Sequence, residues 1–196
     1  MPKFFVNYRT VDSVHSAAAI ADRLARHFGP ENVFRDRDSL ALGALYPKKI
    51  RRALERCDKV LAVIGPTWLD VEDAFGRRRL DNPKDWVRTE LQMAFERDIP
   101  VVPVLLDNTP LPSFDQLPAV IAQLSNCAYW QVRQKSFESD LRGLIAGISA
   151  HEDQAGSEVE VAQYVQHNTA SDNGRVIATQ GGNHVFTFNN GGRDSR

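Results

Sequence analysis

The chain has 196 residues, 42% hydrophobic and 25% charged, a composition typical of a globular protein rather than a disordered or fibrous one. This length allows one ordinary domain with an appendage, and the net charge of −1 gives no basis for binding nucleic acid or an anionic membrane. No apolar run is long enough to span a membrane, and the start turns polar at Asn7, before a signal-peptide core forms. Cys57 and Cys127 fit neither a disulfide framework nor metal-ligand spacing. We therefore expect a cytoplasmic protein with reduced thiols and no metal site.

Composition changes near Ala150. All ten prolines precede that residue, and six of the twelve glycines follow it. Residues 1–150 carry a net charge of +2, from 21 basic and 19 acidic residues, whereas the last 46 carry −3, from 3 basic and 6 acidic residues. The sequence predicts a domain over residues 1–150, a polar linker over 151–167 and a β-prone C-terminal motif over 168–196.

Strands and helices alternate along residues 1–150. Apolar runs predict strands at residues 3–7, 32–34, 60–64, 101–106 and 127–131. Helical spacing of apolar residues predicts helices at 14–28, 47–57, 82–97, 117–124 and from 137 onward, the third capped by Asn82. This alternation predicts a doubly wound α/β fold with a five-stranded parallel sheet of flavodoxin-like order 2-1-3-4-5, flanked by helices.

A sheet of this order has its ligand crevice at the carboxyl ends of the strands, where the winding reverses between the first and third strands. Residues 7–10, 35–45 and 65–69 follow the strands there. The sequence has no glycine-rich phosphate loop and no nucleophile elbow, so nucleotide-binding folds of those types and serine hydrolases have little support. A phosphoacceptor receiver needs clustered aspartates after the first and third strands, where residues 7–8 (NY) and 65–66 (GP) stand instead, which excludes that function.

The third predicted helix carries one carboxylate beside its buried face. Glu90 lies about 60° around the helix axis from the core-facing Val87 and about 40° from Trp86. A carboxylate there is partly desolvated, which makes it a candidate for function. Geometry alone favours a peripheral glutamate whose end lies in water.

Five segments in order resemble a Toll/interleukin-1 receptor (TIR) domain of the bacterial type. They are residues 5–9 (FVNYR), 33–36 (VFRD), 63–69 (VIGPTWL), 85–91 (DWVRTEL) and 99–105 (IPVVPVL). The resemblance extends from Lys3 to about Ile148, and Asn7 stands where the family usually has serine. Many family members cleave the nicotinamide–ribose bond of NAD with the glutamate of a W-x-x-x-E stretch, whose positions Trp86 and Glu90 occupy.

The resemblance thus implies an NAD+ hydrolase that uses NAD as its substrate and needs no cofactor. Glu90 would be the catalytic carboxylate, because nicotinamide leaves as a neutral molecule and only the ribose cation needs stabilising. The candidate substrate-binding residues are Tyr8 for stacking, Arg9 for a phosphate, Asp36 for ribose hydroxyls, and Trp68 and Trp86 for the pocket wall. An ion pair for Arg9, a solvated charge for Asp36 and a hydrophobic plug for Trp68 are the structural alternatives.

The resemblance also implies that self-association through the TIR domain activates the enzyme, in signal transduction or defence against phage. Two alternatives stay open. One is a non-catalytic adaptor that signals by homotypic interaction, and the other is a cyclase that makes a cyclic ADP-ribose-type messenger.

The C-terminal segment has a different character. Residues 175–180 and 184–188 flank a Gly-Gly-Asn turn, a pattern that predicts a small β-hairpin. Residues 168–190 resemble the amyloid-signalling motifs at the C-termini of some bacterial effectors, which implies templating by an NLR-type receptor. A disordered tail and a strand added to the sheet edge are the alternatives.

Overall fold

The computed structural model describes residues 1–35, 46–155, 175–180 and 184–189. The chain divides into two compact units, Met1–Gly156 and Ser157–Arg196. A five-stranded sheet belongs to the first unit and a two-stranded sheet to the second. Among the helices in the described ranges, none combines the length and apolar character needed to cross a membrane.

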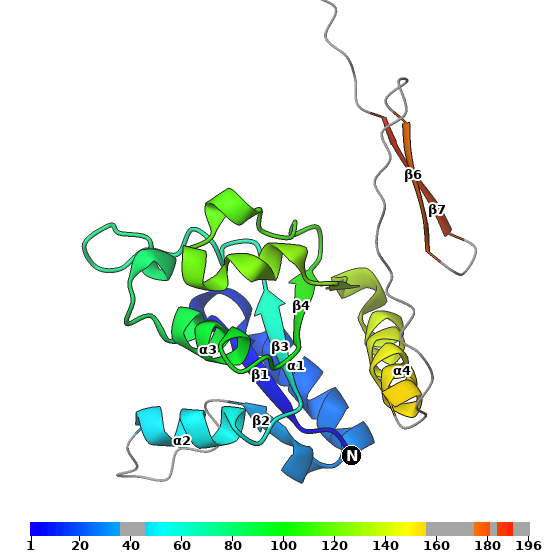
Figure 1. The fold of residues 1–196 in the computed structure, drawn as a ribbon, viewed down its shortest axis with the longest axis horizontal. Coiled ribbons are helices and arrows are strands. Elements are labelled where there is room, and N and C mark those ends of the chain that lie inside the picture. Colours follow the sequence, from blue (N-terminus) through cyan, green and yellow to red (C-terminus); the bar gives the residue numbers. More distant parts are fainter. Residues whose placement is uncertain (36–45, 156–174, 181–183, 190–196) are drawn as a thin grey trace, which may run out of the picture. The chain divides into compact units, whose positions relative to one another are not determined.

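The first unit is built on a parallel sheet of order β2-β1-β3-β4-β5 (Figure 1). Its strands are β1 (Phe4–Tyr8), β2 (Val33–Arg35), β3 (Lys59–Ile64), β4 (Val101–Leu106) and β5 (Trp130–Val132). The predicted fold class and strand order are therefore confirmed. The central strands are almost entirely buried, as continuous apolar runs in a sheet covered on both faces must be.

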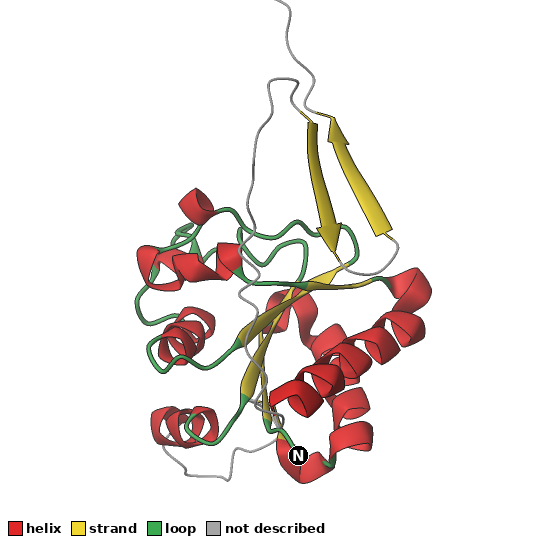
Figure 2. Cartoon of the chain, turned by 45° about the vertical axis from the view of Figure 1, so that its right-hand side comes forward, coloured by secondary structure: helices red, strands yellow, loops and turns green. Residues whose placement is uncertain are grey.

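Helices cover both faces of this sheet (Figure 2). On one face lie α1 (Thr10–Phe28) and α4 (Phe137–Ala155), and on the other α2 (Tyr46–Leu54) and α3 (Trp86–Phe95). Successive side chains of β1 alternate between the faces, so Phe4 and Val6 pack toward α1 and α4, whereas Phe5 packs toward α2 and α3. The same alternation aims Asn7 at α3.

Short 3-10 helices complete the described part of this unit. They are η1 (Pro30–Asn32), η3 (Arg79–Asp81), η4 (Phe114–Gln116), η5 (Ala119–Asn126) and η6 (Gln134–Ser136). The helix predicted at residues 117–124 is thus a 3-10 helix. The fifth strand begins at Trp130, three residues later than predicted. Cys127 caps η5, and its N–H donates to the Leu124 carbonyl at 3.2 Å rather than to a neighbouring strand.

The predicted cap of α3 is wrong. Asp85, not Asn82, precedes the first helical residue, and its side chain accepts a hydrogen bond from the Arg88 backbone N–H at 3.1 Å. Asn82 instead accepts from the Lys84 N–H at 2.9 Å within a turn before the helix. Aspartate and asparagine are both favourable N-cap residues. Asp85 takes this position in α3, where its carboxylate is also held by tertiary contacts.

One interior strand contains a proline. Pro103 of β4 pairs in register with Ala62 of β3, and β5 joins β4 only from Val104 onward. The first half of β4 therefore has a neighbour on one side only. A residue without an N–H is tolerated at such an edge.

The second unit contains β6 (Arg175–Gln180) and β7 (His184–Asn189), paired antiparallel. Their bounds lie within one residue of the two strands predicted from the sequence. In the first unit, α4 continues to Ala155, beyond the predicted boundary at residue 150. The rest of the predicted linker, residues 156–167, lies outside the described residues, as do residues 168–174 and 190–196.

Candidate functional site

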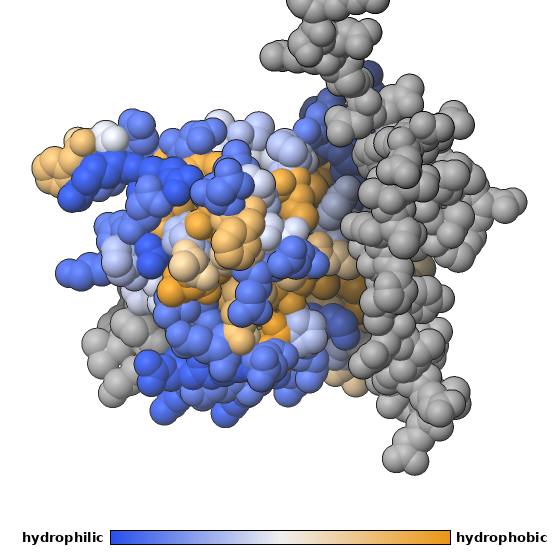
Figure 3. Space-filling view, turned by 45° about the horizontal axis from the view of Figure 1, so that its top comes forward, coloured by the Kyte–Doolittle hydropathy of each residue, from blue (hydrophilic) through white to orange (hydrophobic). Residues whose placement is uncertain are grey.

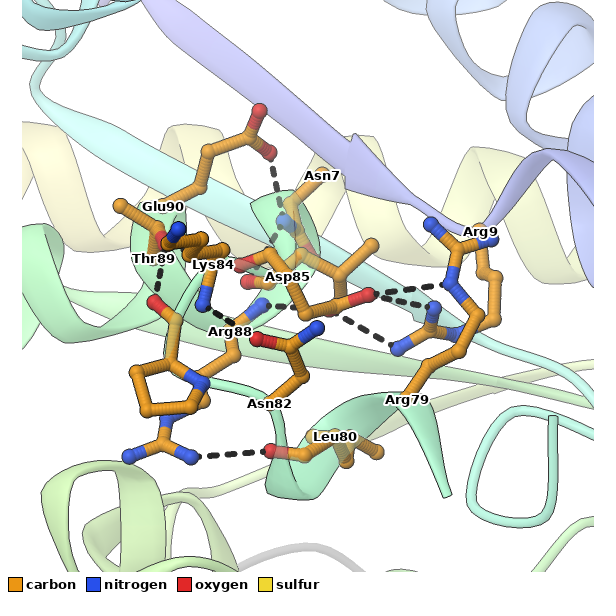
Figure 4. Close-up of polar contacts among 12 residues, drawn as sticks. Asn7, Arg9, Arg79, Leu80, Asn82, Lys84, Asp85, Arg88, Thr89 and Glu90 are labelled. Carbon is orange, nitrogen blue, oxygen red and sulfur yellow. Dashed lines mark hydrogen bonds and ion pairs between the residues drawn. The ribbon is translucent and has the colours of Figure 1, made fainter. Parts of the chain in front are cut away.

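Four polar side chains are buried where the end of β1 meets the start of α3. Asn7, Arg9, Asp85 and Glu90 are 0%, 2%, 4% and 3% exposed, respectively. Figure 4 shows them converging from two elements that are far apart in the sequence. Burial of a polar or charged group is costly unless a partner compensates it, so their contacts determine what this site can do.

Glu90 is held against the sheet by Asn7. The Asn7 side-chain amide donates to Glu90 Oε2 at 2.7 Å and to the Val87 carbonyl oxygen at 3.3 Å, so one residue of β1 binds two turns of α3. The alternative of a peripheral glutamate with its end in water is wrong, because the residue is only 3% exposed. The sequence placed Glu90 at the flank of the buried face, and tertiary packing against β1 buries it further.

Arg9 forms a bidentate ion pair with Asp85. Its two terminal nitrogens lie 3.0 and 3.1 Å from the two carboxylate oxygens, and the side chains are 2% and 1% exposed. Arg79 Nε lies 3.3 Å from the same carboxylate, which also caps α3. The expectation that Arg9 reaches a substrate phosphate does not fit this arrangement, because its guanidinium is committed to a buried partner. Arg9 instead anchors the N-terminus of the helix that carries Glu90.

Trp68 is fully buried in the apolar cluster between the sheet and helices α2 and α3. In this conformation the Trp68 side chain therefore does not line an open pocket, which is the role predicted for it in substrate binding. Its burial fits the alternative, a hydrophobic plug beneath the loop. The loop before it is fixed by Asp12, whose carboxylate accepts from the Gly65 N–H, the Thr67 N–H and the Thr67 hydroxyl at 2.9, 2.9 and 2.8 Å. This contact ties the start of α1 to the carboxyl end of β3.

The remaining predicted site residues lie in different places. Tyr8 is 8% exposed and packs in the cluster facing α1 and α4, on the opposite face of the sheet from Glu90. Trp86 is the first residue of α3 and is 36% exposed. Asp36 lies outside the described residues. Figure 3 shows apolar residues surrounded by hydrophilic ones on the face seen when the top of Figure 1 comes forward.

Sequence reasoning missed three members of the site. Asp85 could have been found, because an aspartate directly before an apolar helical stripe is an N-cap signal. The sole hint for Asn7 was a polar residue at the end of an apolar strand, in the position where the family usually has serine. Arg79 is one of three consecutive arginines, and nothing in that run indicates which of them turns inward. Across the described ranges, no three His, Cys, Asp or Glu side chains are grouped to hold a metal ion.

Comparison with known proteins fits this architecture. A family model for the TIR domain matches residues 4–145. The chain belongs to the TIR domain family. Among solved structures, this TIR domain is similar to the TIR domains of the "activated Roq1 resistosome directly recognizing the pathogen effector XopQ". The TM-score is 0.56 at 13% identity, over 76% of this chain and 99% of that one, a likeness that shows the fold alone. A search of curated proteins found no match to this TIR domain.

Proposed function

We propose that this TIR domain is an NAD+ nucleosidase, with Glu90 as the catalytic carboxylate. The observation that carries the proposal is a glutamate that is 3% exposed and hydrogen-bonded by Asn7 at 2.7 Å beside the carboxyl end of β1. A doubly wound sheet binds its ligand at that edge. A buried acid so placed is a functional candidate in its own right.

The chemistry requires little more than this carboxylate. Nicotinamide is attached to ribose as a cation and leaves as a neutral molecule, so no acid has to protonate it. Positive charge then develops on the ribose, and a fixed carboxylate in a region of low dielectric stabilises it strongly. Asn7 contributes by fixing the orientation of Glu90, so that little reorganisation is needed when the charge appears.

The W-x-x-x-E spacing places the partly exposed Trp86 on the same face of α3 as Glu90, on the path by which a substrate would reach that carboxylate. Residues four apart on a helix are neighbours on one face, and here Trp86 is 36% exposed while Glu90 is buried. We assign Trp86 to flank the nicotinamide ring as it approaches. Tyr8 and Asp36 remain proposed substrate contacts, whereas Arg9 positions α3 and Trp68 fills the core beneath the loop after β3.

Because Glu90 is almost fully covered in the single chain, substrate access needs a rearrangement, and we attribute it to self-association of the TIR domain. Catalysis then depends on assembly. The expected signature is nicotinamide release per protein molecule that rises steeply with protein concentration. A turnover per molecule that stays constant from dilute monomer upward contradicts the self-association step but leaves the role of Glu90 intact.

The decisive experiment incubates concentrated full-length protein with NAD and follows free nicotinamide by chromatography. Glu90→Gln keeps the size and an oxygen for Asn7, and its rate should fall about 10²–10³-fold. The matched control is Glu96→Gln, an exposed glutamate at the end of the same helix, which should leave the rate unchanged. Equal rates for Glu90→Gln and wild type would overturn the proposal.

Absence of release at every concentration favours the adaptor alternative. The released nucleotide separates the remaining two enzymes, since a hydrolase yields ADP-ribose and a cyclase its cyclic form. Chromatography of the same reaction against both standards decides between them.

For the C-terminal unit we propose clustering of the enzyme, in signalling or antiphage defence, through residues 168–190 and a receptor that carries a similar motif. The antiparallel pairing of β6 with β7 supports this, because stacked copies of a hairpin form cross-β structure. A peptide of residues 168–190 should form fibres that bind an amyloid dye. A peptide that stays monomeric under assembly conditions contradicts this role.

A further inference from the structure

A hollow lies between α1 and α4, on the face of the sheet opposite to Glu90. Its volume is about 510 Å³. We call it the α1–α4 groove; it is lined by Arg23, Arg26 and His27 of α1 and by Arg142, Ile145, Ala146 and Ser149 of α4. Both helices are labelled in Figure 1, and none of the four buried polar residues around Glu90 belongs to either of them.

Helical spacing explains why these side chains converge. Arg26 and His27 follow Arg23 at i+3 and i+4 on α1, and the α4 residues follow an i, i+3, i+4, i+7 pattern. Each set therefore forms one stripe along its helix, and the stripes line the same groove. Cationic groups come from both helices, and the apolar Ile145 and Ala146 lie on the α4 side.

The positive charge of the groove is largely uncompensated. Arg23 lies 3.4 Å from Glu138, whose side chain is 65% exposed. Within the described ranges, Arg26 and Arg142 have no carboxylate at ion-pair distance. At least two guanidinium groups thus face a concave surface without an anionic partner.

Ordinary helix electrostatics explains only part of this arrangement. Arg26 and His27 lie in the last turn of α1, where cations are stabilised by the helix dipole. Arg142 lies in the second turn of α4, toward the N-terminal end, where the dipole gives a cation no advantage. Arg26 and Arg142 line the same groove from two helices, so an anionic ligand bound there would be shared by both.

We propose that the α1–α4 groove binds the diphosphate of a nucleoside diphosphate. Guanidinium groups bind phosphate oxygens in bidentate geometry, and arginines on two helices can hold two linked phosphates. The exposed Ala146 offers a small apolar surface for the flat base, with the largely buried Ile145 beneath it, and the Ser149 hydroxyl is an additional hydrogen-bonding group. The volume falls within the range of small-ligand sites, about 300–1,000 Å³.

The test is calorimetric titration of the full-length protein with ADP, with adenosine, inorganic pyrophosphate and NAD as comparison ligands. ADP should bind more tightly than either adenosine or pyrophosphate, because each of these lacks one half of the recognised molecule. Its affinity should fall as sodium chloride is raised. NAD carries the same diphosphate, so tighter binding of NAD than of ADP at this groove would identify the dinucleotide as the ligand and overturn the assignment to nucleoside diphosphates.

Substitutions locate the binding. Arg26→Gln with Arg142→Gln should weaken ADP binding by at least about tenfold, whereas Arg97→Gln, on α3's side of the sheet, should leave it unchanged. Glu90→Gln should also leave it unchanged, which separates this site from the proposed catalytic one. Should the double variant fail to fold, Ala146→Glu places a carboxylate at an exposed position of the groove and should weaken ADP binding as well.

Three results with the variants and with ADP also overturn the proposal. They are no ADP binding up to about 1 mM, equal affinity in the double variant and wild type, and loss of binding in Glu90→Gln. A change of oligomeric state in the Arg26→Gln, Arg142→Gln variant without any ADP binding also overturns it, since the groove is then an interface between protein chains.

Discussion

Replacing the carboxylate of Asp85 tests whether the buried ion pair anchors the helix that carries Glu90. Asp85→Asn keeps an oxygen that can accept from the Arg88 N–H, so the N-cap contribution of about 1 kcal/mol is retained. The charge is lost, and Arg9, which is 2% exposed, is left without its bidentate partner. Removing one partner of a buried pair costs about 3–5 kcal/mol. We therefore expect the free energy of unfolding to fall by about 3–4 kcal/mol.

The assay is urea unfolding followed by tryptophan fluorescence, with linear extrapolation to water. Asp81→Asn is the matched control, because it removes the charge from an exposed pair whose side chains are 32% and 57% exposed. That substitution should cost less than about 1 kcal/mol. A loss for Asp85→Asn as small as that of the control would refute the anchoring role.

A second variant separates the cost of an unpaired charge from the loss of shape. In the Asp85→Asn background, Arg9→Met removes the buried charge while keeping a long side chain. Part of the lost stability should return, because the uncompensated guanidinium is gone. A double variant less stable than Asp85→Asn alone would show that the guanidinium is stabilised by other groups, contrary to the reasoning.

Two further substitutions test close contacts, and one measurement tests a buried thiol. Gly65→Ala places a Cβ 2.5 Å from Asp12 Oδ2, so it should displace that carboxylate and lower the free energy of unfolding by about 1–3 kcal/mol. Gly143→Ala should lower the melting temperature despite alanine's better helix propensity, because the Cβ would lie 2.6 Å from Trp130 Cζ2. Burial, with a smaller contribution from Asp58, raises the pKa of the Cys57 thiol to about 11. Its thiolate is therefore scarce near neutrality, and alkylation at about pH 8 should be about a hundredfold slower than in the unfolded chain, accelerating as the pH rises toward the folded pKa.

Each of these has an internal control. In an Asp12→Ala background, Gly65→Ala should cost far less, and an undiminished cost would contradict the proposed clash. Gly147→Ala has its nearest Trp130 atom at 3.9 Å and should be neutral or stabilising, so equal destabilisation at both helix glycines would contradict the packing argument. Alkylation is measured by mass spectrometry in a Cys127→Ser variant, where one thiol remains, and equal native and unfolded rates would contradict the raised pKa.

The sequence predicted what depends on local periodicity. The run from Val101 to Leu106 is bounded as expected, and a rotation of 100° per residue placed Glu90 beside the buried face of its helix. What it could not predict are contacts between distant segments. Arg9 and Asp85 are 76 residues apart, and only the packing of α3 on β1 brings them together. For the same reason the burial of Trp68 could not be separated from its alternative role in a pocket. The bacterial type of the domain and its linker boundaries stay predictions.

Pro103 has a consequence for how copies of this domain can associate. It occupies the stretch of β4 that β5 does not cover, where an intruding strand would need an N–H to pair with. The outer strands β2 and β5 are only three residues long, so a strand of another copy could form few backbone hydrogen bonds with either of them. Crowding many domains together should therefore leave every sheet finite, with neighbours touching through helices and loops.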